Sequence, residues 1–179
     1  GFDAAATVNG NLTVTSGEIN LSGTSVIGGD VGIAANGALD SVKFQNHDFS
    51  VGGSWDNDGD FDCWACQVTF NAGSGTETIE SDAPSTDIFW DLVFDDSGGS
   101  ATWQVTSTMD VDGGLTITGG TLDANGSNIY VGKNWDNDDT FTHSNATVLF
   151  DGEVASSYLI DADGTGRFYD FTGAEEGEE

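Results

Sequence analysis

The chain has 179 residues and is very acidic, because 31 Asp and Glu against 3 Lys and Arg give a formal net charge of −28. A nucleic-acid-binding surface needs clustered Lys and Arg to neutralise phosphates, so we expect no nucleic acid partner. The same charge disfavours an anionic lipid surface, and no apolar run approaches the roughly 20 residues of a membrane-spanning helix. We therefore expect a soluble chain without a membrane span.

The apolar residues are those of a folded β protein. The 11 Phe, 5 Trp and 3 Tyr are interleaved with Val, Ile and Thr, which favour strands. This pattern excludes a disordered acidic chain, which the net charge alone would favour. The 26 Gly indicate many tight turns, and the length fits a single domain, which we expect over residues 10–173.

Residues 1–9 precede the repeated part of the chain and alternate weakly between apolar and polar residues. We expect either a cap over the first coil or a strand donated to the open sheet edge of a neighbouring copy. In the second case, the assembly contacts come from Phe2, Ala4, Ala6 and Val8. No charged segment followed by an apolar one is found after Gly1, so any targeting segment is expected to have been removed, or the chain is an excised product.

Short runs with apolar residues at every second position predict strands of about five residues. Gly-rich turns separate these runs, and helix content is expected to be very low. In chain order the alternating apolar positions are Leu12 and Val14, Val68 and Phe70, Trp90, Leu92 and Phe94, Leu115 and Ile117, and Val148 and Phe150.

One motif occurs twice. Residues 51–61 and 131–141 share seven of eleven positions at an offset of 80 residues, whereas residues 12–17 match 115–120 at an offset of 103. Stacked units can be inserted whole into a solenoid, so the difference of 23 predicts one extra coil between about residues 22 and 50. A β-sandwich or jelly roll, the alternative fold, would need an uncommonly long structureless loop there. The repeats therefore predict an all-β parallel β-helix.

The repeat also predicts the place of two tryptophans. Trp55 and Trp135 are expected at equivalent, mostly buried positions in stacked coils, each followed by an Asp-Asn-Asp triplet on an exposed turn. Large rings at repeated positions fill the interior of a solenoid, so core packing is the favoured role of the tryptophans over sugar stacking.

The repeats resemble those of bacterial and archaeal cell-surface β-solenoids, and are similar to filamentous-haemagglutinin and adhesin passenger repeats. The resemblance covers roughly Gly10 to Gly173. It implies a right-handed parallel β-helix, an extracellular location and no catalytic residue. The chain is shorter than such proteins usually are, which suggests the protomer of an assembly. The segments that carry the resemblance are Gly10-Asn11-Leu12-Thr13, Val51 to Phe61, Val68-Thr69-Phe70 and Gly119-Gly120-Thr121-Leu122-Asp123.

Carboxylates at alternate positions on tight turns suggest calcium as a cofactor, because this cation takes several oxygen ligands from such loops. The candidate ligands are Asp56, Asp58 and Asp60, then Asp136 and Asp138, and finally Asp161 and Asp163. The last pair resembles the start of an EF-hand loop but lacks the Glu at the twelfth position. Two other interpretations remain, namely ordinary turn chemistry with solvated charge and adaptation to salt.

Cys63 and Cys66 form a lone CxxC pair. A thioredoxin-like role needs a βαβ context that is missing, and a zinc site would have to recruit His47 and His143 from distant coils. A small disulfide loop or two free thiols are therefore favoured. The second copy of the repeat has His143 and Ala146 at these positions, so the pair is no general part of the repeat.

Four sequons provide candidate glycosylation sites, at Asn11, Asn20, Asn125 and Asn145. Four is slightly more than chance supplies, which is a weak sign of glycosylation. Catalysis on acidic sugars usually needs cationic groups to stabilise developing charge. The chain offers only Lys43, Lys133 and Arg167, so we expect no enzyme.

The sequence therefore favours a structural subunit of a self-assembling extracellular filament or cell-surface layer, with copies of itself as partner. A parallel solenoid leaves open strand edges at both ends, and little Lys or Pro is present to protect them. Surface glycans are a further candidate partner, and residues 174–179 form an acidic tail. The alternative is a glycan-binding adhesin or phage tail module or, less favoured, a carbohydrate-active enzyme.

Overall fold

The computed structural model describes residues 5–21, 23–40, 47–63, 65–81, 89–96, 98, 100–152 and 159–173. Within these ranges the chain forms β-strands and short turns, without any helix. It follows that no described segment makes a helix long and apolar enough to cross a membrane.

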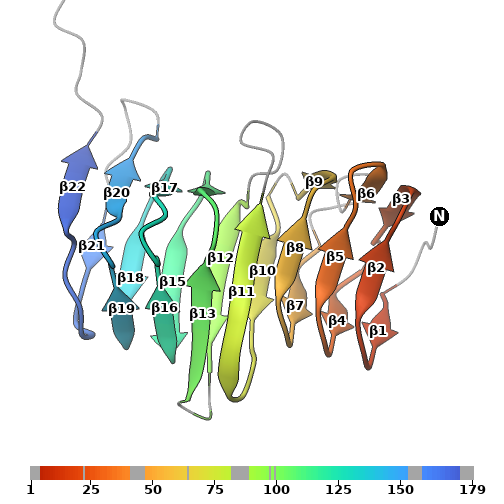
Figure 1. The fold of residues 1–179 in the computed structure, drawn as a ribbon, viewed down its shortest axis with the longest axis horizontal. Coiled ribbons are helices and arrows are strands. Elements are labelled where there is room, and N and C mark those ends of the chain that lie inside the picture. The colour runs from red at the N-terminus through yellow and green to blue at the C-terminus, as the bar shows by residue number, and fades with distance from the viewer. Residues whose placement is uncertain are drawn as a thin grey trace, which may run out of the picture.

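The strands lie on three faces that run the length of the molecule (Figure 1). The first face is one sheet made of β1 (Thr7–Val8), β4 (Ser25–Ile27), β7 (Phe49–Val51), β10 (Gln67–Phe70), β12 (Asp91–Asp95), β15 (Leu115–Gly119), β18 (Trp135–Asn137) and β21 (Ile160–Asp161). The second face is one sheet made of β2 (Leu12–Val14), β5 (Val31–Ile33), β8 (Trp55–Asn57), β11 (Gly75–Ser81), β13 (Ala101–Val105), β16 (Thr121–Asp123) and β19 (Thr140–Thr142). The third face has two sheets, one of β3 (Gly17–Asn20), β6 (Gly37–Asp40) and β9 (Asp60–Asp62), and one of β14 (Met109–Val111), β17 (Ile129–Val131), β20 (Thr147–Phe150) and β22 (Asp170–Gly173).

Each turn of the chain visits the three faces in order, as β4, β5 and β6 do. Every pairing between the described strands is parallel, and from the second turn on each described strand except β14 pairs with its counterpart in the previous turn, whereas β14 meets that turn only through a bridge from Val111 to Phe89. The predicted parallel β-helix is therefore confirmed. The β-sandwich or jelly-roll alternative is wrong, because those folds are built from antiparallel strands.

The 23 additional residues of the first repeat copy correspond to one whole turn, made of β4, β5 and β6. This turn pairs with β1, β2 and β3 on one side and with β7, β8 and β9 on the other. A complete turn can be added because it brings its own three strands and leaves the register of its neighbours unchanged.

The two copies of the repeated motif lie on different faces. Trp55 begins β8 on the second face, whereas Trp135 begins β18 on the first face. The prediction that the two residues occupy equivalent positions in stacked coils is therefore wrong. An offset of 80 residues ends one face before a whole number of turns is completed. Both side chains are nonetheless buried, with exposed fractions of 0% and 1%.

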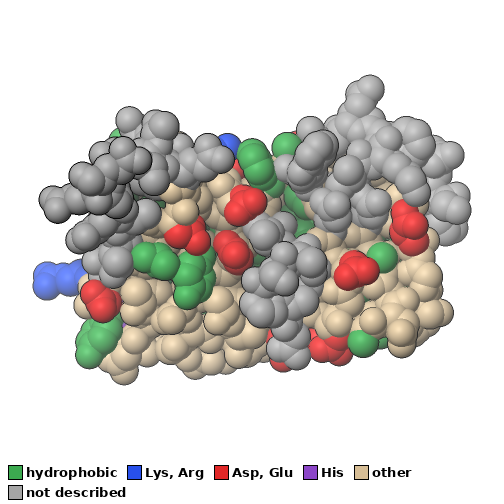
Figure 2. All heavy atoms as spheres, turned by 90° about the horizontal axis from the view of Figure 1, so that it is seen from above, with side chains coloured by type: hydrophobic (Ala, Val, Ile, Leu, Met, Phe, Trp, Pro, Cys, Tyr) green, Lys and Arg blue, Asp and Glu red, His purple; other side chains and the backbone are tan. Residues whose placement is uncertain are grey.

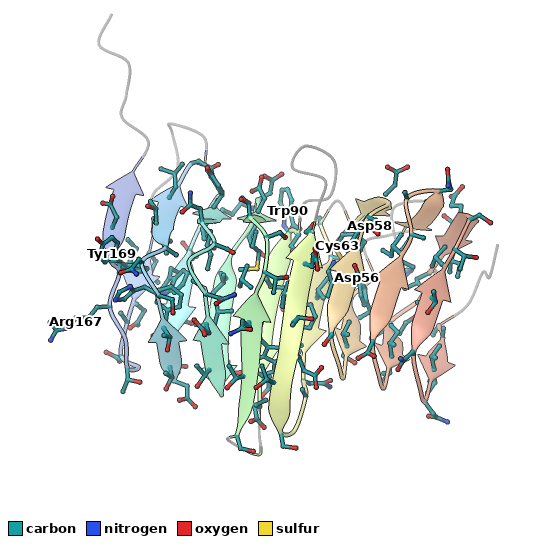
Figure 3. All side chains as sticks on the ribbon, in the orientation of Figure 1. Asp56, Asp58, Cys63, Trp90, Arg167 and Tyr169 are labelled. Carbon is teal, nitrogen blue, oxygen red and sulfur yellow. A yellow bond between two sulfur atoms is a disulfide. The ribbon has the colours of Figure 1, made fainter. Side chains whose placement is uncertain are left out.

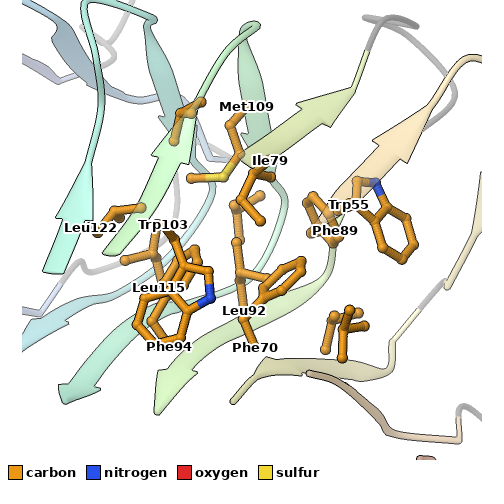
Figure 4. Close-up of a cluster of buried hydrophobic side chains, with 14 of the residues drawn as sticks. Trp55, Phe70, Ile79, Phe89, Leu92, Phe94, Trp103, Met109, Leu115 and Leu122 are labelled. Carbon is orange, nitrogen blue, oxygen red and sulfur yellow. The ribbon is translucent and has the colours of Figure 1, made fainter. Parts of the chain in front are cut away.

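The core consists of the inward side chains of all three faces, and aromatic rings fill much of it (Figure 4). Trp55 and Phe61 meet edge to face with ring centroids 4.8 Å apart, and Phe94 and Trp103 lie 5.3 Å apart. Trp55, Trp103 and Trp135 are all fully buried, which confirms the core role expected for them. Such rings each bury about 150–250 Å² and dominate the stability of a core.

The Asn of each Asp-Asn-Asp triplet is buried, contrary to the prediction of an exposed triplet. Asn57 and Asn137 point inward at the ends of β8 and β18, whereas Asp58 and Asp138 are exposed. The Oδ1 atom of Asn57 accepts a hydrogen bond of 3.1 Å from the backbone N–H of Gly59. These side-chain amides stabilise the corner from the interior of the solenoid, because a buried backbone N–H needs an acceptor.

Glycines and polar side chains stack at the corner between the first and second faces. A Cβ on Gly52 would lie 2.6 Å from the carbonyl oxygen of Gly28 in the previous turn, so only glycine allows this approach. Beside them, Asn11 accepts a hydrogen bond from the backbone N–H of Asp30, and Asp30 accepts one from that of Ser54, each at 3.0 Å. Side chains thus connect successive turns where the strand ladders are interrupted.

Candidate functional site

The first turn surrounds a partly open apolar cavity of about 400 Å³ at the N-terminal end of the solenoid. Val8, Leu12 and Ile19 line it, one from each face, and all three are only partly buried. Their register partners in the second turn are Ile27, Val31 and Leu39, which are buried. The first-turn side chains are therefore core residues that lack a covering layer among the described residues.

Two of the four predicted assembly residues, Ala6 and Val8, are described and lie at this end of the molecule. Val8 lies in β1 opposite Ile27, and the carbonyl of Ala6 accepts a hydrogen bond of 2.8 Å from the N–H of Val26. Both residues are thus paired within their own chain and also line the cavity, rather than forming a free segment. Phe2 and Ala4 lie outside the described residues, as do residues 174–179.

Apolar side chains are also exposed at the C-terminal end. Ile160 continues the inward column of Leu115 and Trp135, yet its exposed fraction is 39%. Leu159 and Tyr169 are 64% and 63% exposed. Three of the four large apolar side chains that are exposed in the described chain thus lie in the last turn, the fourth being Val26 on the side of the second turn.

Phe168 covers part of the core at this end. Its ring lies 5.1 Å from that of Trp135 and 6.0 Å from that of Phe141. Tyr169 stacks on His143 at 5.4 Å. Figure 3 shows Arg167 extending away from the end of the solenoid near Tyr169. The C-terminal end therefore presents aromatic and aliphatic side chains together with one cation.

The predicted calcium ligands of the first motif do not converge. Asp56, Asp58 and Asp60 are all exposed, and Figure 3 shows the first two on the strands and turns around β8. On the surface seen in Figure 2, acidic side chains are scattered among backbone and polar atoms. No group of three or more His, Cys, Asp or Glu side chains in the described part of the chain is arranged to hold a metal ion.

The second acidic group is closer together. Asp136 and Asp161 are register partners on β18 and β21. Partial desolvation raises the pKa of Asp136, and the negative charges of Asp138, Asp161 and Asp163 raise it further. All but Asp136 are exposed. Calcium binding by these four residues, or by those of the first motif, stays a prediction.

Cys63 and Cys66 form a disulfide in the structure, and both side chains are buried. Zinc binding and free thiols, the other interpretations, do not fit this pairing. The backbone N–H of Cys66 donates to the carbonyl of Cys63, and that of Ala146 donates to the carbonyl of His143, each at 2.8 Å. The disulfide therefore closes a turn that the second copy of the repeat makes without one. His47 is described but joins no cluster that could hold a metal.

The four sequons differ in their surroundings. Asn125 and Asn145 are exposed and have positive φ angles of 51° and 68° at turns. In contrast, Asn11 donates a hydrogen bond of 2.8 Å from Nδ2 to Asp30, and the Oδ1 atom of Asn20 is buried. Glycosylation stays a prediction, and it is sterically simplest at the two exposed turns.

Sequence reasoning missed a group of carboxylates at the third face. Burial raises the pKa of Asp110 to about 6, and the charges of Asp151 and Asp112 contribute. Burial also raises the pKa of Asp151. At the adjoining corner, the Nζ atom of Lys133 lies 4.2 Å from the ring centroid of Trp90. An abundance of Asp hides such a group in the sequence, because only the fold determines which carboxylates become neighbours.

A buried carboxylate with a structural role was also missed. Asp96 is 4% exposed and accepts hydrogen bonds from the backbone N–H groups of Gly98, Ser100 and Ala101. It organises the turn between β12 and β13. Three N–H donors stabilise its charge, so this residue belongs to the scaffold and leaves no free oxygen-rich site.

No family model, curated protein or solved structure matches this chain.

Proposed function

We propose that the chain is a structural subunit of an extracellular filament or cell-surface layer that assembles from copies of itself. One observation carries this proposal. In the described chain, the outermost strands of the three faces are β1, β2 and β3 at one end and β21, β19 and β22 at the other, and each pairs with a strand on one side only, apart from an isolated bridge between Thr140 of β19 and Thr165. Unpaired strand edges are templates for pairing with another chain.

The composition of the end strands supports the same function. Proteins that remain monomeric usually protect edges with Lys, Pro, bulges or a covering element. None of β1, β2, β3, β21 and β22 contains Lys or Pro. A cell-surface or extracellular location agrees with the disulfide between Cys63 and Cys66, because disulfides persist in oxidising compartments.

The charge sets the conditions of assembly. Copies that each carry −28 repel one another, so contacts between them require screening salt, bound cations such as calcium, or glycans. We propose no catalytic role, since Lys43, Lys133 and Arg167 are too few to build a site that stabilises anionic intermediates.

Electron microscopy of the purified chain tests the proposal. We expect filaments or sheets at high protein concentration in salt with calcium, and analytical ultracentrifugation should show species far larger than the 18.6 kDa monomer. Isolated short rods under all of these conditions would refute self-assembly. In that case binding to an array of surface glycans would identify the adhesin or phage tail alternative.

A further inference from the structure

The two ends of the solenoid are complementary rather than alike. The N-terminal end has a hollow, the cavity of about 400 Å³ over Leu21 and Ile27. The C-terminal end has exposed apolar side chains, among them Leu159, Ile160 and Tyr169. An apolar hollow at one end and apolar side chains at the other can be buried together only when the two ends belong to different copies.

We propose that the last turn of one copy docks in the N-terminal cavity of the next, so that copies stack head to tail with a single polarity. This inference rests on the proposed self-assembly and adds to it the partner surface and the direction of stacking. The occupant of the cavity is thus a second copy of this chain.

Strand direction supports this polarity. All described strand pairs are parallel, and stacking β1 on β21 and β3 on β22 of another copy keeps them parallel. The order of the faces is also preserved, because β22 ends the third face and β1 begins the first. Contact between two N-terminal ends would instead bring two hollows together and pair the strands in opposite directions.

Charge supports the same arrangement. Arg167 lies on the last turn and extends from the end of the solenoid (Figure 3). Glu18 lies on β3 of the first turn and is exposed. Head-to-tail stacking brings Arg167 of one copy to the end that carries Glu18 in the other, whereas stacking of two N-terminal ends brings only copies of Glu18 together.

Matched Ile-to-Glu substitutions at the two ends test the polarity. Ile19→Glu places a charge in the cavity and leaves the C-terminal end intact, and Ile160→Glu does the reverse. Val26→Glu adds the same charge at an exposed apolar residue on the side of the solenoid and serves as the control. The full-length proteins are compared by analytical ultracentrifugation in the salt at which the wild type assembles, with circular dichroism to verify folding.

Each end variant alone should remain monomeric, and Val26→Glu should assemble as the wild type does. An equimolar mixture of the two end variants should stop at a 1:1 heterodimer, because it contains one intact cavity and one intact last turn. If either variant loses its fold, Ala5→Glu and Tyr169→Glu replace them, since both of these residues are exposed.

The other results distinguish this inference from the proposed function. Assembly of both end variants to wild-type size, or a monomeric mixture beside an assembling wild type, overturns head-to-tail docking and leaves self-assembly standing. Homodimers of one variant alone indicate stacking of like ends and also overturn it. A wild type that never assembles removes both proposals, and if it then assembles only after deletion of residues 1–4, the chain's own N-terminal segment occupies the cavity.

Discussion

Trp55 and Trp135 occupy the same position in two copies of one motif but lie on different faces of the solenoid. Their local surroundings are nevertheless the same. Trp55 meets Phe61 at 4.8 Å with an interplanar angle of 75°, and Trp135 meets Phe141 at 4.8 Å and 76°. The motif thus specifies a strand, a corner and the next strand, and not a particular face.

We expect Trp55→Ala and Trp135→Ala each to lower the free energy of unfolding by about 3–5 kcal/mol, because both remove a fully buried ring. Chemical denaturation measures the loss. Trp90→Ala is the control. Because Trp90 is only partly buried, its substitution should lower the free energy of unfolding clearly less. Near-neutral behaviour of Trp55→Ala and Trp135→Ala would show that these rings do not support the core.

The raised pKa of Asp110 predicts a pH dependence. In the folded state Asp110 titrates near pH 6 rather than near 3.8, so between these values the folded chain binds more protons than the unfolded chain. Stability from this group is therefore present below about pH 4 and is lost as pH rises through 6. We expect Asp110 to contribute about 1 kcal/mol to the free energy of unfolding in this pH range, after allowance for the solvent screening of a half-exposed group.

Melting temperatures at pH 5 and pH 7 test this expectation. Asp110→Asn should reduce the difference between the two values, whereas Asp58→Asn, which removes a charge from an exposed turn, should leave it largely unchanged. An Asp110→Asn variant with the complete wild-type pH dependence would assign the effect to other carboxylates.

Calcium is expected to stabilise the protein at micromolar to millimolar concentration if the acidic turns form real sites. Screening alone requires far more salt and hardly distinguishes calcium from magnesium. Melting curves with calcium, magnesium or a chelator at fixed ionic strength separate the two effects. Asp136→Asn with Asp161→Asn should weaken a calcium-specific shift, and an unchanged melting temperature after chelation would leave only screening.

Loss of the disulfide should be tolerated. Closing a loop as short as Cys63 to Cys66 removes little entropy from the unfolded chain, about 2 kcal/mol in the loop-entropy model. We expect the Cys63→Ala, Cys66→Ala double variant to lose about this much stability and to keep its fold, because the equivalent turn at His143 and Ala146 forms without a disulfide. Loss of the β-sheet signal in circular dichroism would instead make the disulfide essential.

The period-2 runs and the repeated motif predicted the parallel β-helix because each strand buries every second side chain, whatever the face. The extra turn β4–β6 was predictable for the same reason, since whole turns are added without changing the register. The face on which a repeat lies could not be predicted. It depends on how many sides separate the copies, and the segments between them vary in length.

The candidate site was less predictable than the fold. The sequence indicated open ends, but the cavity exists only because Val8, Leu12 and Ile19 come together from three strands. The burial of Asn57 was missed, because an Asp-Asn-Asp triplet has the composition of an exposed turn and only the corner geometry turns the amide inward. The environment of Asp110 likewise depends on Asp151, a distant residue in the chain.

The rotation of the repeat has a consequence for longer chains built from the same unit. Each offset of 80 residues ends one face before a whole number of turns is completed. A third copy would therefore place its Trp on the remaining face, and a fourth would return to the face of the first. Successive copies would thus wind their Trp–Phe pairs around the axis as a slow superhelix. The large aromatic side chains would then be distributed equally among the three faces. A solenoid lengthened by duplication would therefore keep the same cross-section along its length.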